Sequence, residues 1–222
     1  TAAKGGTSMR EAVLPVDLAK ALGGNVDMTT TLVNGWIPAE GFAIKEHPTE
    51  VNTEGQSDGM VIGWGIRTDI HTKGEGKKFV ERMRAVQGNL PAMLKIQGEF
   101  MEWYYGAQRI DSLLQDARLP KPTQAMYNPK AKPAAIALYD ATWLGGYGDS
   151  QTGKVGKAKG TGGKLILQAF QAPNETEALR IFYNSNLYMK GKAKGTPAAN
   201  RNQRFIDGIQ YYHRFIKPTL KR

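Results

Sequence analysis

Helical spacing of apolar residues runs through most of the 222-residue chain, and a β-type run interrupts it in one place. Phe79, Val80, Met83 and Val86 form one such stripe, with apolar side chains recurring every three or four positions. The segment Ala134–Leu144 is apolar on nearly all sides, which predicts a central buried helix. We expect further helices at 9–22, 90–119, 163–172, 175–189 and 199–216, and a shorter apolar stretch, kinked at Pro38, at 29–42.

Residues 49–75 differ from the rest because they are rich in Thr, Gly, Asp and Asn. Within them, Met60-Val61-Ile62-Gly63-Trp64 is an apolar run typical of a strand, and it predicts a short hairpin or small sheet. No Pro/Ser linker is long enough to separate independent domains. The fold class expected is therefore mainly α (α+β), with residues 1–222 as a single domain and a small β-containing lobe at about 45–75.

The positive charge is concentrated in the last third of the chain. Residues 1–150 carry 16 Lys and Arg against 17 Asp and Glu, whereas residues 151–222 carry 14 against 3. Gly-Lys-Ala-Lys-Gly-Thr occurs twice in this region, at 156–161 and 191–196, and both copies are typical of surface loops. Such a block attracts polyanions, so nucleic acid, anionic lipid and bacterial cell-wall polymer are candidate partners.

Several classes are excluded by composition. The chain has no cysteine, which excludes disulfide scaffolds, thiolate metal sites and cysteine nucleophiles. No run approaches the ~18 apolar residues of a membrane span. His47, His71 and His213 are scattered, so we expect no metal site and no cofactor, although Asp69 and His71 could share one strand face.

Glu40 and Asp58 are the carboxylates best placed for chemistry. Glu40 follows an apolar stretch and precedes Gly41, while Asp58 opens the run that predicts the hairpin. Hydrolysis of a glycosidic bond needs an acid with a raised pKa and an ionised partner that activates water or attacks directly. A Glu at the end of a buried helix suits the first role, and an Asp in a polar turn suits the second.

This arrangement resembles the lysozyme superfamily, nearest to the glycoside hydrolase family 46 chitosanases. A Glu at a helix end is followed about eighteen residues later by Asp-Gly and a Gly-rich hairpin. The apolar helix with Tyr139-Asp140-Ala141 and the later run Gln203-Arg204-Phe205 are similar to pieces of that family in the same order. The resemblance implies a two-lobed helical fold whose small β lobe lines a cleft, with Glu40 as general acid and Asp58 as general base.

The chain departs from the family pattern at the threonine that positions the attacking water. Residues 60–63 are Met-Val-Ile-Gly, so we take Thr68, ten residues after Asp58, as the candidate for this role. A register similar to phage lysozymes is the alternative; it places Asn52 where that family has Asp and Val61 where it has Thr. The second carboxylate is missing in this register, a loss that a lytic transglycosylase, which depends on one Glu, would tolerate.

The remaining candidates concern substrate binding. Trp64, in the Gly-flanked hairpin, is expected to stack on a sugar ring, whereas Trp143 is assigned to the core. Tyr139 and Asp140 are candidate substrate contacts, and Arg204 is a candidate that could also pair with a carboxylate behind the cleft.

The function expected is cleavage of β-1,4 glycosidic bonds in peptidoglycan by a muramidase of endolysin type. Chitosan is a polycation that the basic 151–222 region would repel, whereas this region would hold the protein to an anionic wall. The protein would then act on the bacterial cell wall after secretion, release by phage or delivery on a virion. A chitosanase, a lytic transglycosylase and a basic nucleic-acid-binding protein remain the alternatives, the last being disfavoured because the basic loops carry no recognised motif.

Overall fold

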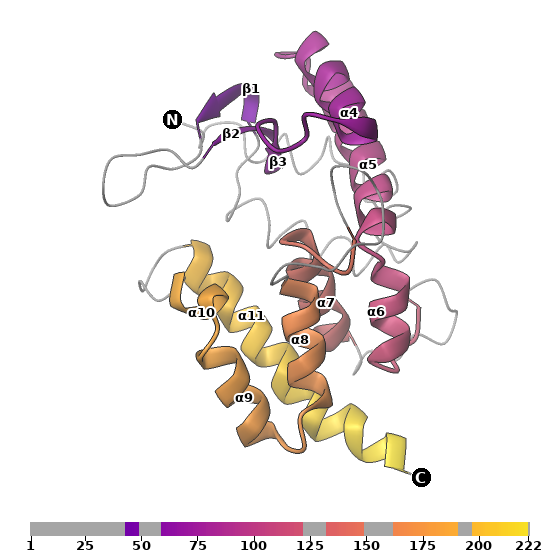
Figure 1. Ribbon diagram of the computed structural model, residues 1–222, viewed down its shortest axis with the longest axis vertical. Coiled ribbons are helices and arrows are strands. Elements are labelled where there is room, and N and C mark those ends of the chain that lie inside the picture. The colour runs from indigo at the N-terminus through magenta and orange to yellow at the C-terminus, as the bar shows by residue number, and fades with distance from the viewer. Residues whose placement is uncertain (1–42, 49–58, 122–131, 149–161, 191–196, 222) are drawn as a thin grey trace.

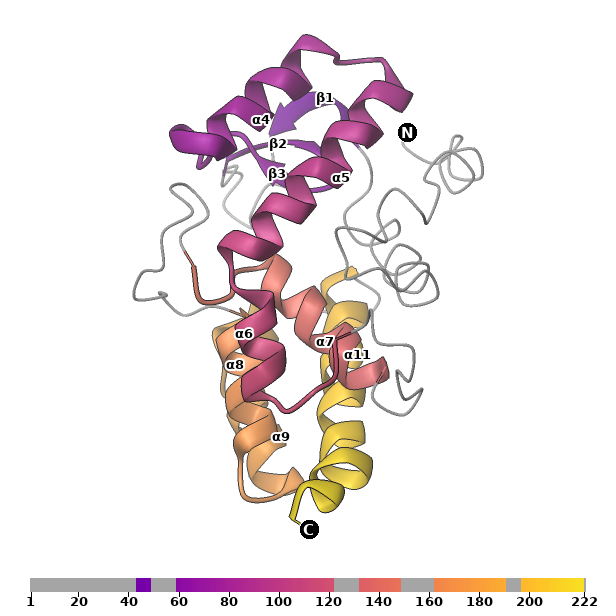
Figure 2. The same ribbon diagram turned by 90° about the vertical axis from the view of Figure 1, so that its right-hand side faces the viewer.

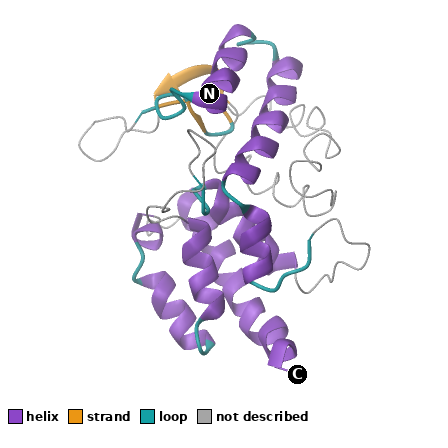
Figure 3. Ribbon diagram, turned by 45° about the vertical axis from the view of Figure 1, so that its right-hand side comes forward, coloured by secondary structure: helices purple, strands orange, loops and turns teal. Residues whose placement is uncertain are grey.

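The computed structural model describes residues 43–48, 59–121, 132–148, 162–190 and 197–221. Within these ranges the protein is mainly helical with a small antiparallel sheet (Figures 1 and 3), which confirms the fold class expected at its coarser level. The strands are β1 (Ala43–Pro48), β2 (Met60–Gly63) and β3 (Ile66–Arg67), in the order β1-β2-β3. Ala43 pairs with Gly63 and Pro48 with Met60, so β1 and β2 begin at opposite ends of their ladder.

The turn between β2 and β3 depends on glycine. Gly63 and Gly65 have φ angles of +63° and +72°, a region that side chains with a Cβ rarely occupy. Gln97, on the following long helix, accepts a hydrogen bond from the backbone N–H of Trp64 through Oε1 at 3.0 Å. A Cβ on Gly63 would lie 2.4 Å from the same Oε1 atom, so the turn is packed directly against this helix.

Two helices accompany the sheet, and we call β1–β3 with the helix α4 (Gly74–Ala85) the sheet unit. The helix α5 (Leu90–Ala107) begins with Asn89, whose Oδ1 accepts from the N–H of Ala92 at 3.3 Å, and with Pro91 in its first turn. Figures 1 and 2 show α5 running from the sheet unit to the remaining helices. It contacts both β2 and α7.

The remaining helices form the helical unit. They are α6 (Ile110–Asp116), α7 (Lys132–Trp143), α8 (Gly162–Gln171), α9 (Glu175–Tyr183), α10 (Asn186–Lys190) and α11 (Pro197–Tyr211), followed by a π-helical turn Tyr212–Ile216 and a 3-10 turn Lys217–Lys221. None of the described helices is long and apolar enough to cross a membrane.

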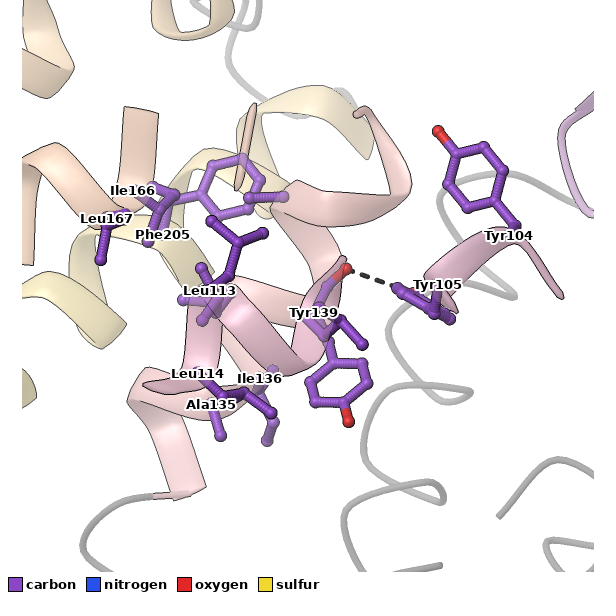
Figure 4. Packing of buried hydrophobic residues seen from close by; sticks show 14 of the residues in the cluster. Tyr104, Tyr105, Leu113, Leu114, Ala135, Ile136, Tyr139, Ile166, Leu167 and Phe205 are labelled. Atoms are coloured by element: carbon purple, nitrogen blue, oxygen red, sulfur yellow. Dashed lines mark hydrogen bonds between the residues drawn. The ribbon is translucent and has the colours of Figure 1, made fainter. Parts of the chain in front are cut away.

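The helix α7 is the centre of this unit, as its all-round apolar sequence predicts. Every residue from Ala134 to Thr142 is buried, and α7 packs against α6, α8 and α11. Figure 4 shows Leu113, Ile166 and Phe205 among the buried side chains that pack around it. The approach to α11 is close because small residues face each other: a Cβ on Gly208 would lie 2.4 Å from the Cβ of Ala137.

Three details of the predicted elements are wrong. The strand β1 was not anticipated, because its residues do not alternate between buried and exposed, which is the pattern that marks a strand with one buried face. The helix expected over 90–119 is divided into α5 and α6 at Arg109, which has a φ of +57°. The helix expected over 175–189 breaks at Ser185, whose hydroxyl accepts from the N–H of Tyr188 at 3.2 Å and so begins α10. The segments 9–22 and 29–42 lie outside the described residues.

Candidate functional site

A pocket of about 360 Å³ lies where the sheet unit, α5 and the helical unit meet. The sheet unit and the loop that follows it line one side, α5 lines the floor, and the end of α7 with α11 lines the other side. The lining residues are Val61, Gly65, Arg67, Ile70, His71, Phe100, Tyr104, Trp143, Leu144 and Arg201. Pockets of this size between structural units, lined by aromatic side chains with a few polar groups, are typical of ligand sites.

Aromatic rings form one continuous wall of the pocket. The Tyr104 ring lies 5.1 Å from that of Trp143 and 5.7 Å from that of Phe100, and the His71 ring meets Phe100 edge-on at 5.1 Å. The Tyr104 hydroxyl donates to the backbone carbonyl of Trp143 at 2.9 Å, which joins α5 to the end of α7. Burial raises the pKa of Tyr104 far above its ordinary value, so this hydroxyl stays protonated.

The wall includes an indole that sequence reasoning assigned elsewhere. Trp143 was expected in the core, but it is only partly buried and lines the pocket. Trp64 was expected to stack on a sugar, but its side chain has no exposed surface and packs in the core beneath the β2–β3 turn. The expectation for Trp64 is wrong in this arrangement, because the glycines around it let the backbone turn over the ring rather than expose it.

A cluster of charges lies behind the wall. Asp140 has no exposed surface, and its Oδ2 accepts from Nε of Arg204 at 2.9 Å, while Nη2 of Arg204 lies 2.7 Å away. Nε of Arg201 lies 3.6 Å from Oδ1 of the same carboxylate. Burial, followed by the nearby charge of Arg204, lowers the pKa of Arg201 to about 10, so the guanidinium is still charged at neutral pH.

The structure therefore separates the roles predicted for these residues. The pairing of Arg204 with a carboxylate is confirmed, and the carboxylate is Asp140. Asp140 and Tyr139 are themselves buried, so neither presents a surface that a substrate could touch. The backbone carbonyl of Tyr139 accepts from the Tyr105 hydroxyl at 3.2 Å (Figure 4), a contact that attaches α5 to α7.

Thr68 follows the pocket residue Arg67 but is not itself among the residues that line the pocket. Its side chain is buried and its hydroxyl donates to Oε1 of Glu46. Arg84 donates to both oxygens of Glu46 at 2.7 Å, and these bonds lower the pKa of the Glu46 carboxyl. The Thr68 hydroxyl is thus part of a hydrogen-bond network that connects β1 to α4. Nothing in this network supports the predicted role of Thr68 in positioning a water.

Asp69 is also engaged within the sheet unit. Arg67 donates to it from Nε at 2.8 Å and from Nη2 at 2.6 Å, and the backbone N–H of Met60 donates to Oδ1 at 3.1 Å. These bonds, those from Arg67 first, lower the pKa of Asp69 to about 2. In the part of the chain that the structure describes, no group of three His, Asp or Glu side chains is placed to hold a metal ion.

Glu40 and Asp58 lie outside the described residues, as do both basic hexapeptides. The described arginines of the C-terminal region are largely engaged with carboxylates: Arg180 lies 2.8 Å from Glu177, and Arg214 lies 2.6 Å from Glu175. The excess of positive charge in 151–222 thus comes mainly from lysines, of which four belong to the two hexapeptides.

Arg201 and Tyr104 are two of the pocket residues that sequence reasoning missed. A signal for Arg201 existed, because it precedes Arg204 by three positions and both lie on one face of a predicted helix. Tyr104 carried no such signal, since Trp103, Tyr104 and Tyr105 are consecutive and their spacing alone does not show which ring faces a pocket.

Comparisons with protein-family models, with curated proteins and with solved structures give no match for this chain.

Proposed function

We propose that the protein is a glycosidase that cleaves β-1,4 bonds of peptidoglycan, with the pocket between the sheet unit and the helical unit as part of its saccharide site. One observation carries this proposal: the strand that follows Asp58-Gly59 lines an aromatic pocket on a helical body. Val61 and Gly65, from the run that resembles the lysozyme superfamily, line this pocket together with Tyr104 and Trp143. Aromatic rings of this kind suit the apolar faces of pyranose rings.

Glu40 is the proposed general acid, and Asp58 the proposed base. In the hydrolytic route Glu40 protonates the glycosidic oxygen while Asp58 takes a proton from the water that attacks the anomeric carbon. Glu40 precedes β1 by three residues and Asp58 precedes β2 by two.

The strand register sets a condition on this pair. The two strands begin at opposite ends of a ladder about 16 Å long, at about 3.3 Å per residue. Glu40 and Asp58 can therefore act on the same glycosidic bond only if the segments that enter β1 and β2 turn toward each other.

A lytic transglycosylase is the second candidate, and the engagement of Thr68, the candidate for the water-positioning threonine, favours it. Val61 lines the pocket without a hydroxyl, and the Thr68 hydroxyl donates to Glu46. A transglycosylase needs no water for cleavage, because the C6 hydroxyl of the cleaved sugar attacks its own anomeric carbon. Glu40 would then give its proton to the leaving oxygen and take one from the C6 hydroxyl, and Asp58 would be dispensable.

The basic 151–222 region supports peptidoglycan over chitosan as the substrate. Peptidoglycan and its attached polymers are anionic, so a net surplus of eleven cations would hold the protein to the wall and would repel a polycation. The protein would accordingly act at the bacterial cell wall, and its binding there would weaken with salt.

The loss of turbidity of outer-membrane-permeabilised Gram-negative cells tests this proposal. The wild type is expected to lyse them, and Glu40→Gln to bind them without lysis. Asp58→Asn distinguishes the candidates, because it abolishes lysis by the hydrolytic route and spares lysis by a transglycosylase. No lysis by the wild type would contradict both candidates.

A further inference from the structure

We infer that Gln97 is a positioning residue for the pocket: it holds the β2–β3 turn against α5 and so fixes the spacing between this turn and the aromatic wall. The positioning role rests on the contacts between the turn and α5 alone. The consequence that Gln97 governs the affinity for a saccharide rests on the function proposed above.

Gln97 lies beside the pocket without lining it. It has no exposed surface, and it shares one face of α5 with Phe100 and Tyr104, which follow it by three and seven positions and line the pocket. The strand β2 lies against α5 here (Figure 2). The Oε1 atom of Gln97 accepts the backbone N–H of Trp64 at 3.0 Å, and the next residue, Gly65, lines the same pocket. This hydrogen bond therefore joins the part of the lining that comes from the turn to the part that comes from α5.

The side-chain amide of Gln97 is only half satisfied. Its Nε2 group is buried and has no hydrogen-bond partner among the described residues. Turning the amide over would remove the acceptor and place a donor against the N–H of Trp64, so the orientation is fixed. Met93 and Met101, one turn before and after Gln97, are both fully buried, and a third methionine would suit this apolar surrounding without an unsatisfied donor. A cost of this kind is expected where a residue serves function rather than stability.

The β2–β3 turn is a short element that benefits from an external restraint. The strand β3 has two residues, and two residue pairs set its register with β2. Gly63 and Gly65 have positive φ angles, and glycine has the widest backbone freedom of the residue types. The bond to Gln97 restrains the centre of this turn. A pocket wall that is ordered before the ligand arrives loses less entropy on binding, so this restraint raises the affinity of the pocket for its ligand.

Gln97→Met tests this role, because it keeps the length of the side chain and removes both the acceptor and the unsatisfied donor. We expect its thermal midpoint to stay near that of the wild type, while its affinity for soluble peptidoglycan fragments, measured by calorimetry, falls about three- to tenfold. Tyr212→Phe is the matched control. It removes the buried hydrogen bond of 2.7 Å from the Tyr212 hydroxyl to the carbonyl of Ala117 in the helical unit, and it should leave the affinity unchanged.

Gln97→Glu is the conservative variant. At about pH 5 burial should hold its carboxyl group neutral, so an acceptor oxygen remains at the same place and the affinity should be retained. Relaxation of backbone amides in NMR tests the role without any ligand. The order parameter of the Gly65 N–H should fall in Gln97→Met and keep the wild-type value in Gln97→Glu and Tyr212→Phe.

An unchanged order parameter of Gly65 in Gln97→Met would overturn the positioning role. An equal loss of affinity in Gln97→Met and in either of the other variants would overturn it too. If the wild type binds no peptidoglycan fragment while Gly65 becomes more mobile in Gln97→Met, the positioning role stands and the proposed saccharide site does not. If the wild type and Gln97→Met bind the fragments equally, the saccharide site stands and the positioning role does not.

Discussion

Asp140 on α7 and Arg204 on α11 form an ion pair of 2.7 Å whose carboxylate has no exposed surface. A buried carboxylate is tolerated because the guanidinium donates to it in a fixed geometry, and removing Arg204 would take away the closer of the two guanidinium groups described beside it. The pair thus connects the central helix to the helix that packs most extensively against it, and it stands directly behind the pocket residue Arg201.

Arg204→Ala should therefore lower the free energy of unfolding by about 3–5 kcal/mol. Urea denaturation followed by circular dichroism measures this change. Arg180→Ala is the matched control, because Arg180 pairs with Glu177 at 2.8 Å on the exposed face of α9. Its midpoint should stay close to that of the wild type, and equal losses in the two variants would contradict a structural role for the buried pair.

Gly63→Ala should destabilise the sheet unit more than Gly88→Ala does. Both glycines have positive φ angles, +63° and +86°, so each substitution costs about 1–2 kcal/mol of backbone strain. A Cβ at Gly63 also meets Gln97 Oε1, the acceptor of the Trp64 N–H, whereas nothing lies within 4 Å of a Cβ at Gly88. Thermal unfolding of the two variants measures the difference, which we expect to be about 1 kcal/mol or more. Similar losses would mean that the turn is not held by Gln97.

Asp69 should make the protein sensitive to acid. Arg67 holds the pKa of Asp69 at about 2 in the folded state, below the unfolded value of about 4. The unfolded chain therefore binds this proton first as pH falls, so the contribution of the pair is present above about pH 4 and is lost toward pH 2. Unfolding measured from pH 6 to pH 2 should show Asp69→Asn less stable than the wild type at the upper end, with the gap closing at the lower end. A gap that is constant with pH would argue against the ion pair.

Trp143→Leu should weaken the binding of soluble peptidoglycan fragments about three- to tenfold, because the pocket would lose one aromatic face. Isothermal titration calorimetry provides the measurement. Trp103→Leu is the control, since Trp103 packs against Phe79 at 5.7 Å and is not part of the pocket lining. If both substitutions weaken binding equally, loss of packing rather than loss of the stacking face is responsible.

Much of the helical framework could be predicted from the sequence, because the spacing of apolar residues along these segments agrees with which of their side chains are buried. Val80 and Met83, from the predicted apolar stripe, are buried in α4. The apolar residues on both sides of Ala137 in the sequence predict the central helix, and they are buried in α7. The division at Arg109 could not be predicted from local pattern. Gln108 accepts backbone N–H groups of Gly146 through its side chain and of Tyr147 through its carbonyl, and these partners lie almost forty residues away.

The candidate site was less predictable for a similar reason. Trp64 and Trp143 have the same chemistry, and which of them reaches the pocket depends on how the sheet unit sits on α5. Asp140 and Arg204 are 64 positions apart and meet only because α7 and α11 pack side by side. Pairing with a carboxylate was foreseen as one option for Arg204, but the burial of Asp140 and the place of Arg201 in the pocket lining follow from tertiary packing.

The most direct test of the proposed glycosidase is mass spectrometry of the soluble products released from isolated peptidoglycan. The wild type should release muropeptides, with new reducing ends if cleavage is hydrolytic and with anhydro ends if it is a transglycosylation, and Glu40→Gln should release none. If the wild type leaves the isolated peptidoglycan intact and no saccharide enters solution, the protein is not a peptidoglycan glycosidase.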